Sequence, residues 1–192
     1  MASQAPIATS RSATGIPTGR LAVWWVICSE IVIFGGVLAS YIMFRLKYAH
    51  WGDIAANTNT LFGSINTFVL LTSSLFIVLA HYYAERKDTR KSFMFIWLTI
   101  LGGLCFLAIK SVEWTHEIQH GMTISSNLFW SFYYTAAGIH AMHVIAGMVI
   151  MGILSVDVAK GKNLHRVELI GIYWHFVDIV WIFLFPLLYI AK

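Results

Sequence analysis

Charged residues are scarce in this sequence. They make up only 11% of its 192 residues, whereas 58% are hydrophobic and the mean hydropathy is +0.72. About a quarter of the residues of a typical soluble domain are charged, so the scarcity excludes an ordinary soluble domain. It indicates a polytopic membrane protein. The net charge of +4 is modest and does not suggest binding to nucleic acid.

Cysteine is equally rare, and the marks of a secreted protein are absent. Cys28 and Cys105 both lie within apolar stretches, which predicts small buried side chains and no disulfide framework. Residues 1–20 contain no acidic residue and no apolar run typical of a secretory signal peptide, so we expect a polar tail along the surface. The sequence also has no internal repeat, phosphate-binding loop, nucleophile elbow or catalytic triad.

Long apolar runs, in contrast, are abundant. A helix needs roughly 20 apolar residues to cross the ~30 Å hydrocarbon core of a bilayer. Five runs are near or above that length, and they cover residues 21–44, 65–83, 93–112, 128–156 and 169–190. The sequence therefore predicts an all-α fold, a single bundle of five transmembrane helices over residues 21–192.

The basic residues are concentrated on one side of this bundle. The tail and the second and fourth connections carry nine of them: Arg11, Arg20, Arg86, Lys87, Arg90, Lys91, Lys160, Lys162 and Arg166. The other side has Arg45, Lys47, Lys192 and also Lys110, whose side chain we expect to extend to the membrane surface. The positive-inside rule then predicts a cytoplasmic N-terminus and a periplasmic C-terminus. The acidic segment 113–120 becomes part of an outer loop.

Five ionisable residues lie within the apolar runs at similar depth. A rise of ~1.5 Å per residue places Glu30 and Asp178 about 14 Å from the cytoplasmic ends of their helices. His140, His143 and His175 come out at or near the same level. Ionisable residues at membrane depth are costly and face protein or water rather than lipid. We therefore expect a buried polar layer in the inner half of the membrane.

Three interpretations of this layer remain open from the residues alone. His140, His143, His175 and Asp178 are residue types that bind zinc, copper or haem iron. With Glu30 they are also the types that relay protons in pumps. The third interpretation, which we favour, is structural: hydrogen-bonded polar pairs fix the rotation of neighbouring helices. In that case Asp178 is expected to pair with His175 or His140.

Five short segments carry a resemblance to a known family. They are ICSEIVIF (27–34, with Ser29 and Glu30), INTFVLLTSS (65–74, with Asn66 and Thr67), the pair Glu113 and Trp114, GIHAMHVIAG (138–147, with Gly138 and Gly147) and YWHFVDIVW (173–181, with Tyr173, Trp174 and Trp181). In this order and spacing they resemble subunit III of the haem–copper respiratory oxidases. The resemblance covers roughly residues 20–191, nearly the whole chain.

This resemblance implies a role inside a larger enzyme. Oxidases of this family reduce oxygen to water and pump protons, and their haem and copper are held by other subunits. Subunit III carries no catalytic or metal centre. It contacts the catalytic subunit I in a complex that also contains subunit II, supports proton uptake and binds phospholipid in a cleft. Bacterial members with five helices lack the leading helix pair that forms one wall of that cleft, so no lipid-binding residue is carried over.

Two motifs favour one branch of the family. Glu30 after Ser29, and the segment YWHFVD, resemble the cytochrome c oxidase branch, which implies a multi-pass protein of the bacterial inner membrane. A subunit III-like protein of a quinol oxidase or a nitric oxide reductase is the alternative. A free-standing membrane haem protein or a transporter is the alternative from a different class.

Overall fold

A computed structural model of the chain describes residue 15 and residues 17–48, 51–56 and 58–191. These residues form five long helices, each long and apolar enough to cross a membrane: α1 (Thr18–Lys47), α3 (Thr60–Glu85), α4 (Thr89–Gln119), α5 (Leu128–Ala159) and α6 (Arg166–Phe185). A short helix, α2 (Trp51–Ala55), precedes α3, and one π-helical turn, η2 (Pro186–Ile190), continues α6. The predicted five-helix fold is confirmed. Most of the expected tail, including Arg11, and also Lys192 lie outside the described residues.

Polar caps fix where three of the helices begin. A side-chain oxygen at the N-cap accepts a hydrogen bond from a backbone N–H of the first turn that has no partner within the helix. The cap residues of α3, α4 and α5 and the amides that they bind are Asn59 with Leu61 (3.1 Å), Asp88 with Lys91 (3.1 Å) and Asn127 with Trp130 (3.0 Å). Short connections between these helices keep consecutive helices antiparallel.

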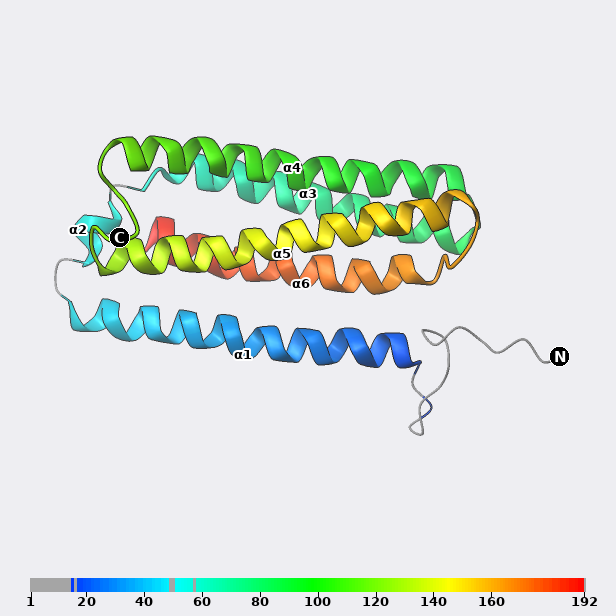
Figure 1. The fold of residues 1–192 in the computed structure, drawn as a ribbon, viewed down its shortest axis with the longest axis horizontal. Coiled ribbons are helices and arrows are strands. Elements are labelled where there is room, and N and C mark those ends of the chain that lie inside the picture. The colour runs from blue at the N-terminus through cyan, green and yellow to red at the C-terminus, as the bar shows by residue number, and fades with distance from the viewer. Residues whose placement is uncertain (1–14, 16, 49–50, 57, 192) are drawn as a thin grey trace.

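The helices are arranged in three layers (Figure 1). The hairpin of α3 and α4 lies over the hairpin of α5 and α6, with α3 against α6 and α4 against α5, so these four helices form a bundle. The helix α1 lies beyond α5 and α6 and contacts mainly those two helices. Its apolar window is only 11% buried, whereas that of α6 is 50% buried. The core of the molecule therefore surrounds α6.

The helix α4 is longer than the apolar run that predicts it. It continues to Gln119, so Glu113 and Glu117 are helical and buried rather than part of an outer loop. Their spacing of four residues places both on the face of α4 that packs into the bundle. The prediction of an outer loop from residue 113 was therefore wrong, because it followed hydropathy and ignored the helical periodicity of the polar residues.

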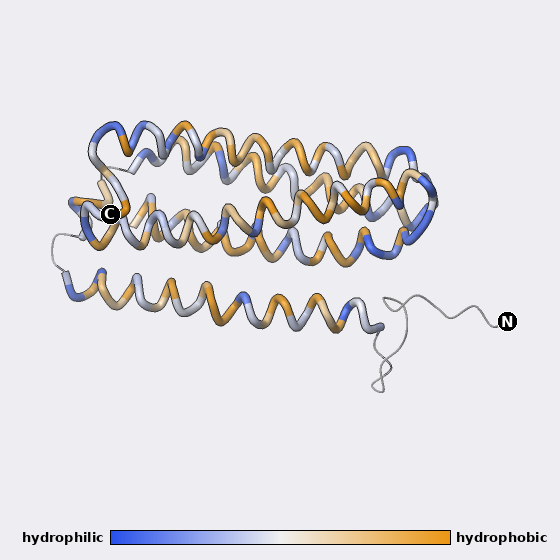
Figure 2. Tube along the Cα trace, in the orientation of Figure 1, coloured by the Kyte–Doolittle hydropathy of each residue, from blue (hydrophilic) through white to orange (hydrophobic). Residues whose placement is uncertain are grey.

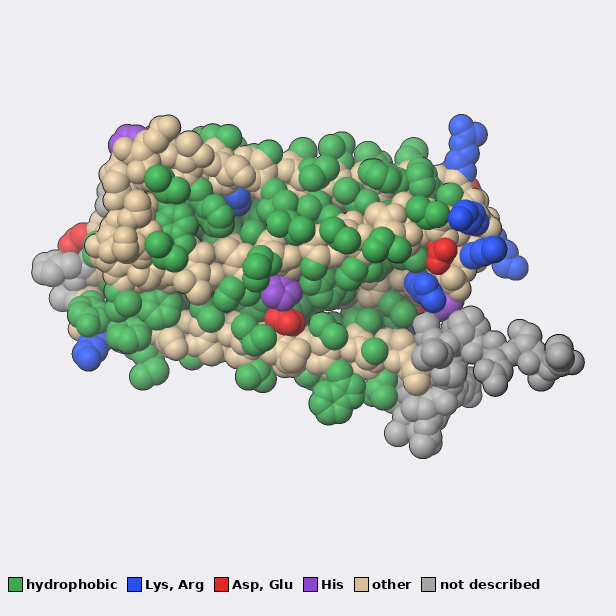
Figure 3. Space-filling view, in the orientation of Figure 1, with side chains coloured by type: hydrophobic (Ala, Val, Ile, Leu, Met, Phe, Trp, Pro, Cys, Tyr) green, Lys and Arg blue, Asp and Glu red, His purple; other side chains and the backbone are tan. Residues whose placement is uncertain are grey.

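The surface has the distribution expected for a membrane protein. Hydrophilic residues gather at the two ends of the molecule and hydrophobic residues cover the length between them (Figure 2). In the space-filling view, hydrophobic side chains spread along one long face, and Lys and Arg side chains cluster at its right-hand end, where α4 and α6 begin (Figure 3). In a bilayer these apolar side chains face lipid tails rather than water. The band is therefore typical of a lipid-facing surface.

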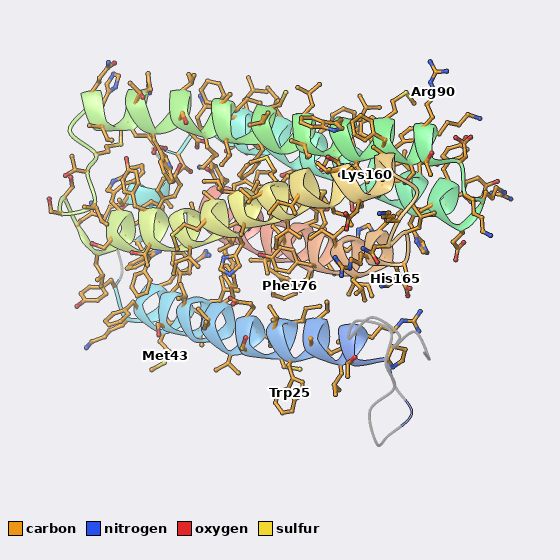
Figure 4. The ribbon with its side chains drawn as sticks, turned by 45° about the vertical axis from the view of Figure 1, so that its right-hand side comes forward. Trp25, Met43, Arg90, Lys160, His165 and Phe176 are labelled. Carbon is orange, nitrogen blue, oxygen red and sulfur yellow. The ribbon has the colours of Figure 1, made fainter. Side chains whose placement is uncertain are left out.

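Two apolar grooves separate α1 from the bundle. A groove of about 560 Å³ lies between α1, α5 and α6, with Asp157 and Arg166 among its lining residues. A groove of about 660 Å³ lies between α1 and α6 and is lined by apolar side chains together with His175. In Figure 4, Phe176 lies between α6 and α1, whereas Trp25 and Met43 point away from the bundle. Polar contacts therefore matter for the position of α1.

Candidate functional site

The segments 65–74 of α3 and 173–181 of α6, both parts of the family resemblance, lie side by side. Three side-chain pairs join them: Trp174 Nε1 donates to Ser73 Oγ (3.1 Å), Trp181 Nε1 donates to Thr67 Oγ1 (3.0 Å), and Ser74 Oγ lies 2.6 Å from His175 Nδ1. Both tryptophans are fully buried. A buried indole N–H without an acceptor costs free energy. Each hydroxyl oxygen is the acceptor for its tryptophan. The two motifs together fix the packing of α3 against α6.

Small residues make room for Trp174. A Cβ atom on Gly147 would lie 2.9 Å from its ring, and a Cβ atom on Gly103 would lie 3.1 Å from it. These distances are shorter than ordinary carbon contacts, so glycine at both positions lets α4 and α5 close around the indole. Gly138 differs, because a Cβ atom there would meet nothing within 4 Å.

Glu30 and His143 of the expected polar layer meet between α1 and α5. His143 Nε2 lies 2.9 Å from Glu30 Oε2, and both side chains are more than four-fifths buried. The two atoms are close enough for an ion pair, but they are not aligned as in a hydrogen bond. His143 Nδ1 lies 2.8 Å from the carbonyl oxygen of Ile139, which can only accept, so Nδ1 carries a proton. The contact therefore brings Nε2 of α5 and a carboxyl oxygen of α1 together at the level of the expected polar layer.

His140 and Asp178 are buried without hydrogen-bond partners. The ring of His140 lies between those of Phe106 (5.5 Å between centroids) and Trp181 (5.2 Å), and neither of its nitrogens has a partner. Neither carboxyl oxygen of Asp178 has one either. Ser74 lies close enough to Asp178 to interact with it, but its hydroxyl group makes the 2.6 Å contact with His175.

The expected pairing of Asp178 with His175 or His140 was therefore wrong. His175 binds Ser74 on α3 instead, and aromatic rings enclose His140. The helical spacing of residues 175 and 178 places them on one face, but it does not fix which neighbouring helix each side chain meets.

The same geometry bears on the metal or haem interpretation of the layer. His143 is directed to α1 and His175 to α3, while His140 is enclosed by rings, so the three imidazoles do not converge. In the part of the chain that the structure describes, no three His, Cys, Asp or Glu side chains are grouped so that they could hold a metal ion.

The environment of Asp178 leads to a first prediction. The variant Asp178→Asn keeps the shape of the side chain and, because neither carboxyl oxygen has a partner with hydrogen-bond geometry, disturbs at most the approach of Ser74. We expect the free energy of unfolding to change by less than the ~1 kcal/mol that one hydrogen bond contributes on average. Denaturation of the variant in mixed micelles checks this. A loss of about 3–5 kcal/mol, as for a broken buried ion pair, would reveal a partner for Asp178.

The most extensive polar cluster of the molecule lies elsewhere, around Lys110 of α4. We expected this side chain to reach the membrane surface, and that expectation was wrong: Lys110 is only 3% exposed, and Glu113 and Glu117 are equally buried. Lys110 Nζ donates to Glu113 Oε2 (3.1 Å), to Tyr133 Oη of α5 (3.0 Å) and to Tyr189 Oη of η2. We call Lys110, Glu113, Glu117, Tyr133 and Tyr189 the Lys110 cluster. It joins α4, α5 and η2.

Every proton of the Lys110 cluster has an acceptor. An ammonium group has three donors, and the three contacts of Lys110 use all of them. Tyr189 Oη donates its own proton to Glu113 Oε1 (2.7 Å). Tyr133 Oη has one proton, and Glu113 Oε1 (2.9 Å), Glu117 Oε1 (3.0 Å) and Tyr189 Oη (3.0 Å) all lie within reach of it. The rings of both tyrosines also lie within about 5 Å of the ammonium group, at 4.8 and 5.3 Å between Nζ and the ring centroids. The arrangement therefore accommodates a charged lysine inside the bundle.

The remaining motif residues have simpler surroundings. Ser29 is exposed, and its hydroxyl group donates to the carbonyl oxygen of Val26 in its own helix (2.7 Å). Asn66 is fully buried, and its side-chain amide has no hydrogen-bond partner. The Trp114 ring lies 5.6 Å from that of Tyr134. None of these three residues contacts the Glu30–His143 pair or the Lys110 cluster through a hydrogen bond of its side chain among the described residues.

Comparison with known proteins gives a family over almost the full length of the chain. The family model for cytochrome c oxidase subunit III matches residues 8–192. The chain belongs to the cytochrome c oxidase subunit III family. The resemblance inferred from the five motifs is thereby confirmed.

Individual relatives agree with this family. Cytochrome c oxidase subunit 3 of Corynebacterium diphtheriae is 32% identical over 170 residues, which cover 85% of this chain and 83% of the relative. Probable quinol oxidase subunit 3 of Staphylococcus saprophyticus is 30% identical over 179 residues, or 88% and 87% of the two chains. Heme-copper oxidase subunit I+III of Aeropyrum pernix is 30% identical over 185 residues, which cover 90% of this chain but 22% of that relative.

Proposed function

We propose that this chain is the non-redox subunit III of a bacterial haem–copper cytochrome c oxidase, in which it stabilises the catalytic subunit and supports proton uptake during reduction of oxygen to water. The family match over residues 8–192 carries the proposal. The oxidase as a whole translocates protons, and this chain contributes no catalytic step. Its haem and copper partners belong to other subunits. The relatives named quinol oxidase subunit 3 make a quinol oxidase the second candidate.

The catalytic subunit I is the direct partner in this proposal. The relative from Aeropyrum pernix carries subunits I and III in its name, and this chain matches only 22% of its length. A single polypeptide that contains both subunits supports close association of separate ones. Subunit II and other oxidase subunits complete the complex. Residues 21–192 act as one membrane unit, and phospholipids from the surrounding membrane are further partners.

The polar layer has a structural role in this proposal. Two apolar grooves lie between α1 and the bundle. The Glu30–His143 contact supplies a polar link between α1 and α5 at its own level. His140, His175 and Asp178 belong to the same layer by helical depth. In the proposed orientation the polar layer is expected in the half of the membrane from which an oxidase takes up protons, so a contribution to the proton-uptake environment is the alternative role of Glu30.

The proposed orientation places the N-terminus in the cytoplasm. Eight basic residues among those described lie at the end of the molecule where α1, α4 and α6 begin: Arg20, Arg86, Lys87, Arg90, Lys91, Lys160, Lys162 and Arg166. The other end has Arg45 and Lys47. Burial, followed by the neighbouring charge of Arg166, lowers the pKa of His165, so this residue adds little positive charge at neutral pH. The asymmetry supports an inner, cytoplasmic location for the basic end.

Cysteine labelling tests this orientation. In a background with Cys28→Ser and Cys105→Ser, we expect Gln119→Cys to react with a membrane-impermeant maleimide added to intact spheroplasts. We expect Lys162→Cys to react only after the membrane is opened, because it lies at the basic end. Both positions are exposed, so burial does not hide either of them. Labelling of Lys162→Cys alone in intact spheroplasts would mean that the topology is the reverse of the proposed one. Equal labelling of both positions would contradict an odd number of spans between them.

Co-purification tests the function itself. An affinity tag on this chain is expected to recover subunits I and II of an oxidase, with haem absorbance and the signal of a dicopper centre. Recovery of haem–copper subunits without a dicopper centre would favour the quinol oxidase. Recovery of a nitric oxide reductase, or of the chain alone with a haem band, would contradict the proposal.

A further inference from the structure

The last residues of the chain leave the α-helical pattern. Pro186 has no backbone N–H, so it interrupts the ladder of hydrogen bonds, and the next turn is a π-helix in which the amide of Ala191 donates to the carbonyl oxygen of Pro186 (2.8 Å). The carbonyl groups at the end of any helix need partners from elsewhere. The conformation of residues 186–191 therefore depends on contacts with other parts of the fold.

Those partners come from α1 and from the start of α3. Tyr41 Oη donates to the carbonyl oxygen of Leu187 (2.7 Å), and Thr60 Oγ1 donates to that of Tyr189 (3.3 Å). Tyr41 is 2% exposed, and its ring packs against that of Trp51 at a centroid distance of 5.3 Å. The hydrogen bond to Leu187 is thus a buried link between α1 and the end of the chain.

The Lys110 cluster binds the same segment from the opposite side. Tyr189 accepts from the Lys110 ammonium group and donates to Glu113, and it is fully buried. The segment therefore lies between α1 on one side and α4 and α5 on the other. The layer formed by α5 and α6 lies between α1 and α4 (Figure 1).

We propose that residues Pro186–Ala191 form a C-terminal strap, which holds the Tyr41 end of α1 against the bundle and is itself fixed in place by the Lys110 ammonium group. Two further polar contacts of α1 act at different levels: Arg20 pairs with Glu168 near its start, and Glu30 contacts His143 near its middle. Release of the strap loosens the Tyr41 end of α1, where the ring contacts of Tyr41 with Phe129 and Phe132 remain, and leaves the other end as it is.

Spin-label distances test the strap in the full-length chain purified in its membrane complex. One pair of labels, at Met43 of α1 and Val112 of α4, reports on the strap end, and a second pair, at Trp25 and Trp97, reports on the opposite end. Met43, Val112, Trp25 and Trp97 are 72, 60, 71 and 48% exposed, so labels at these positions disturb little packing. Cys28 and Cys105 are replaced by serine.

The variants Tyr189→Phe and Tyr41→Phe each keep the ring and remove one hydroxyl group that makes a hydrogen bond of the strap, that of Tyr189 within it or that of Tyr41 to Leu187. We expect a longer and broader distribution of Met43–Val112 distances in both variants and unchanged Trp25–Trp97 distances. Ser111→Ala is the matched control, because its exposed hydroxyl group binds only the carbonyl oxygen of Leu107 in its own helix. Unchanged Met43–Val112 distances would overturn the proposal. Equal changes at both ends would also overturn it, since they indicate general loosening.

Discussion

The variant Lys110→Met is expected to lose about 3–5 kcal/mol of unfolding free energy, the largest effect of any single substitution that we predict. Removing one partner of a buried ion pair leaves the other charge uncompensated, which costs about that much. Here Glu113 loses its counter-charge, and Tyr133 and Tyr189 lose a donor that is fully enclosed. Methionine fills a volume similar to that of the lysine stem. Unfolding in mixed micelles, followed by the change in tryptophan fluorescence, measures the loss.

A double-mutant cycle separates the ion pair from general packing. Glu113→Gln alone is expected to destabilise the chain, whereas the double variant Lys110→Met/Glu113→Gln should lose less than the sum of the single losses. Residues in direct contact show interaction energies of about 0.5–3 kcal/mol in such cycles. Ser111→Ala, on the exposed face of the same helix, serves as the control and should leave stability unchanged. Strictly additive losses would mean that Lys110 and Glu113 do not stabilise one another.

The Lys110 cluster also shows which contacts the sequence alone did not predict. Hydropathy and motif order were enough for five helices and for the family. The pattern Lys110, Glu113, Glu117 has the spacing of one helical face, and this signal was available in the sequence. It was outweighed by the position of Lys110 near the end of an apolar run, which favours a side chain extended to the surface. The two tyrosines that complete the cluster lie on other elements, so only the packing could reveal them.

Asp178 illustrates a second limit. Helical periodicity relates residues on one helix, but the partner of a side chain is set by the rotation and the register of the neighbouring helix. The Glu30–His143 contact joins helices that are far apart in sequence, and Ser74, which meets His175, belonged to a motif with no predicted contact. The membrane-depth estimate gave the correct neighbourhood for Glu30 and His143. It carried no information on which of three histidines an acidic residue would meet.

An oxidase purified without this chain is expected to reduce oxygen at first and then to lose activity over successive turnovers. The metal centres lie on other subunits in the proposed assembly, so the chemistry persists when subunit III is removed. In the proposed role, what is lost is the support that α1 and the polar layer would give on the side of proton uptake. The rate should also fall more steeply as pH rises, because a lower proton concentration makes proton supply limiting sooner. Steady-state oxygen consumption at several pH values measures both effects.

The matched control for this experiment is the complete oxidase taken through the same detergent treatment, followed by re-addition of the purified chain to the depleted enzyme. Restored endurance during turnover would show that the loss reflects the missing subunit rather than the treatment. If depletion abolishes activity at once while the haem and copper spectra remain intact, this chain carries a catalytic step. The role of a non-redox subunit would then be wrong, even though the family assignment would remain. If depletion changes neither endurance nor the dependence on pH, the polar layer serves only to hold the five helices together.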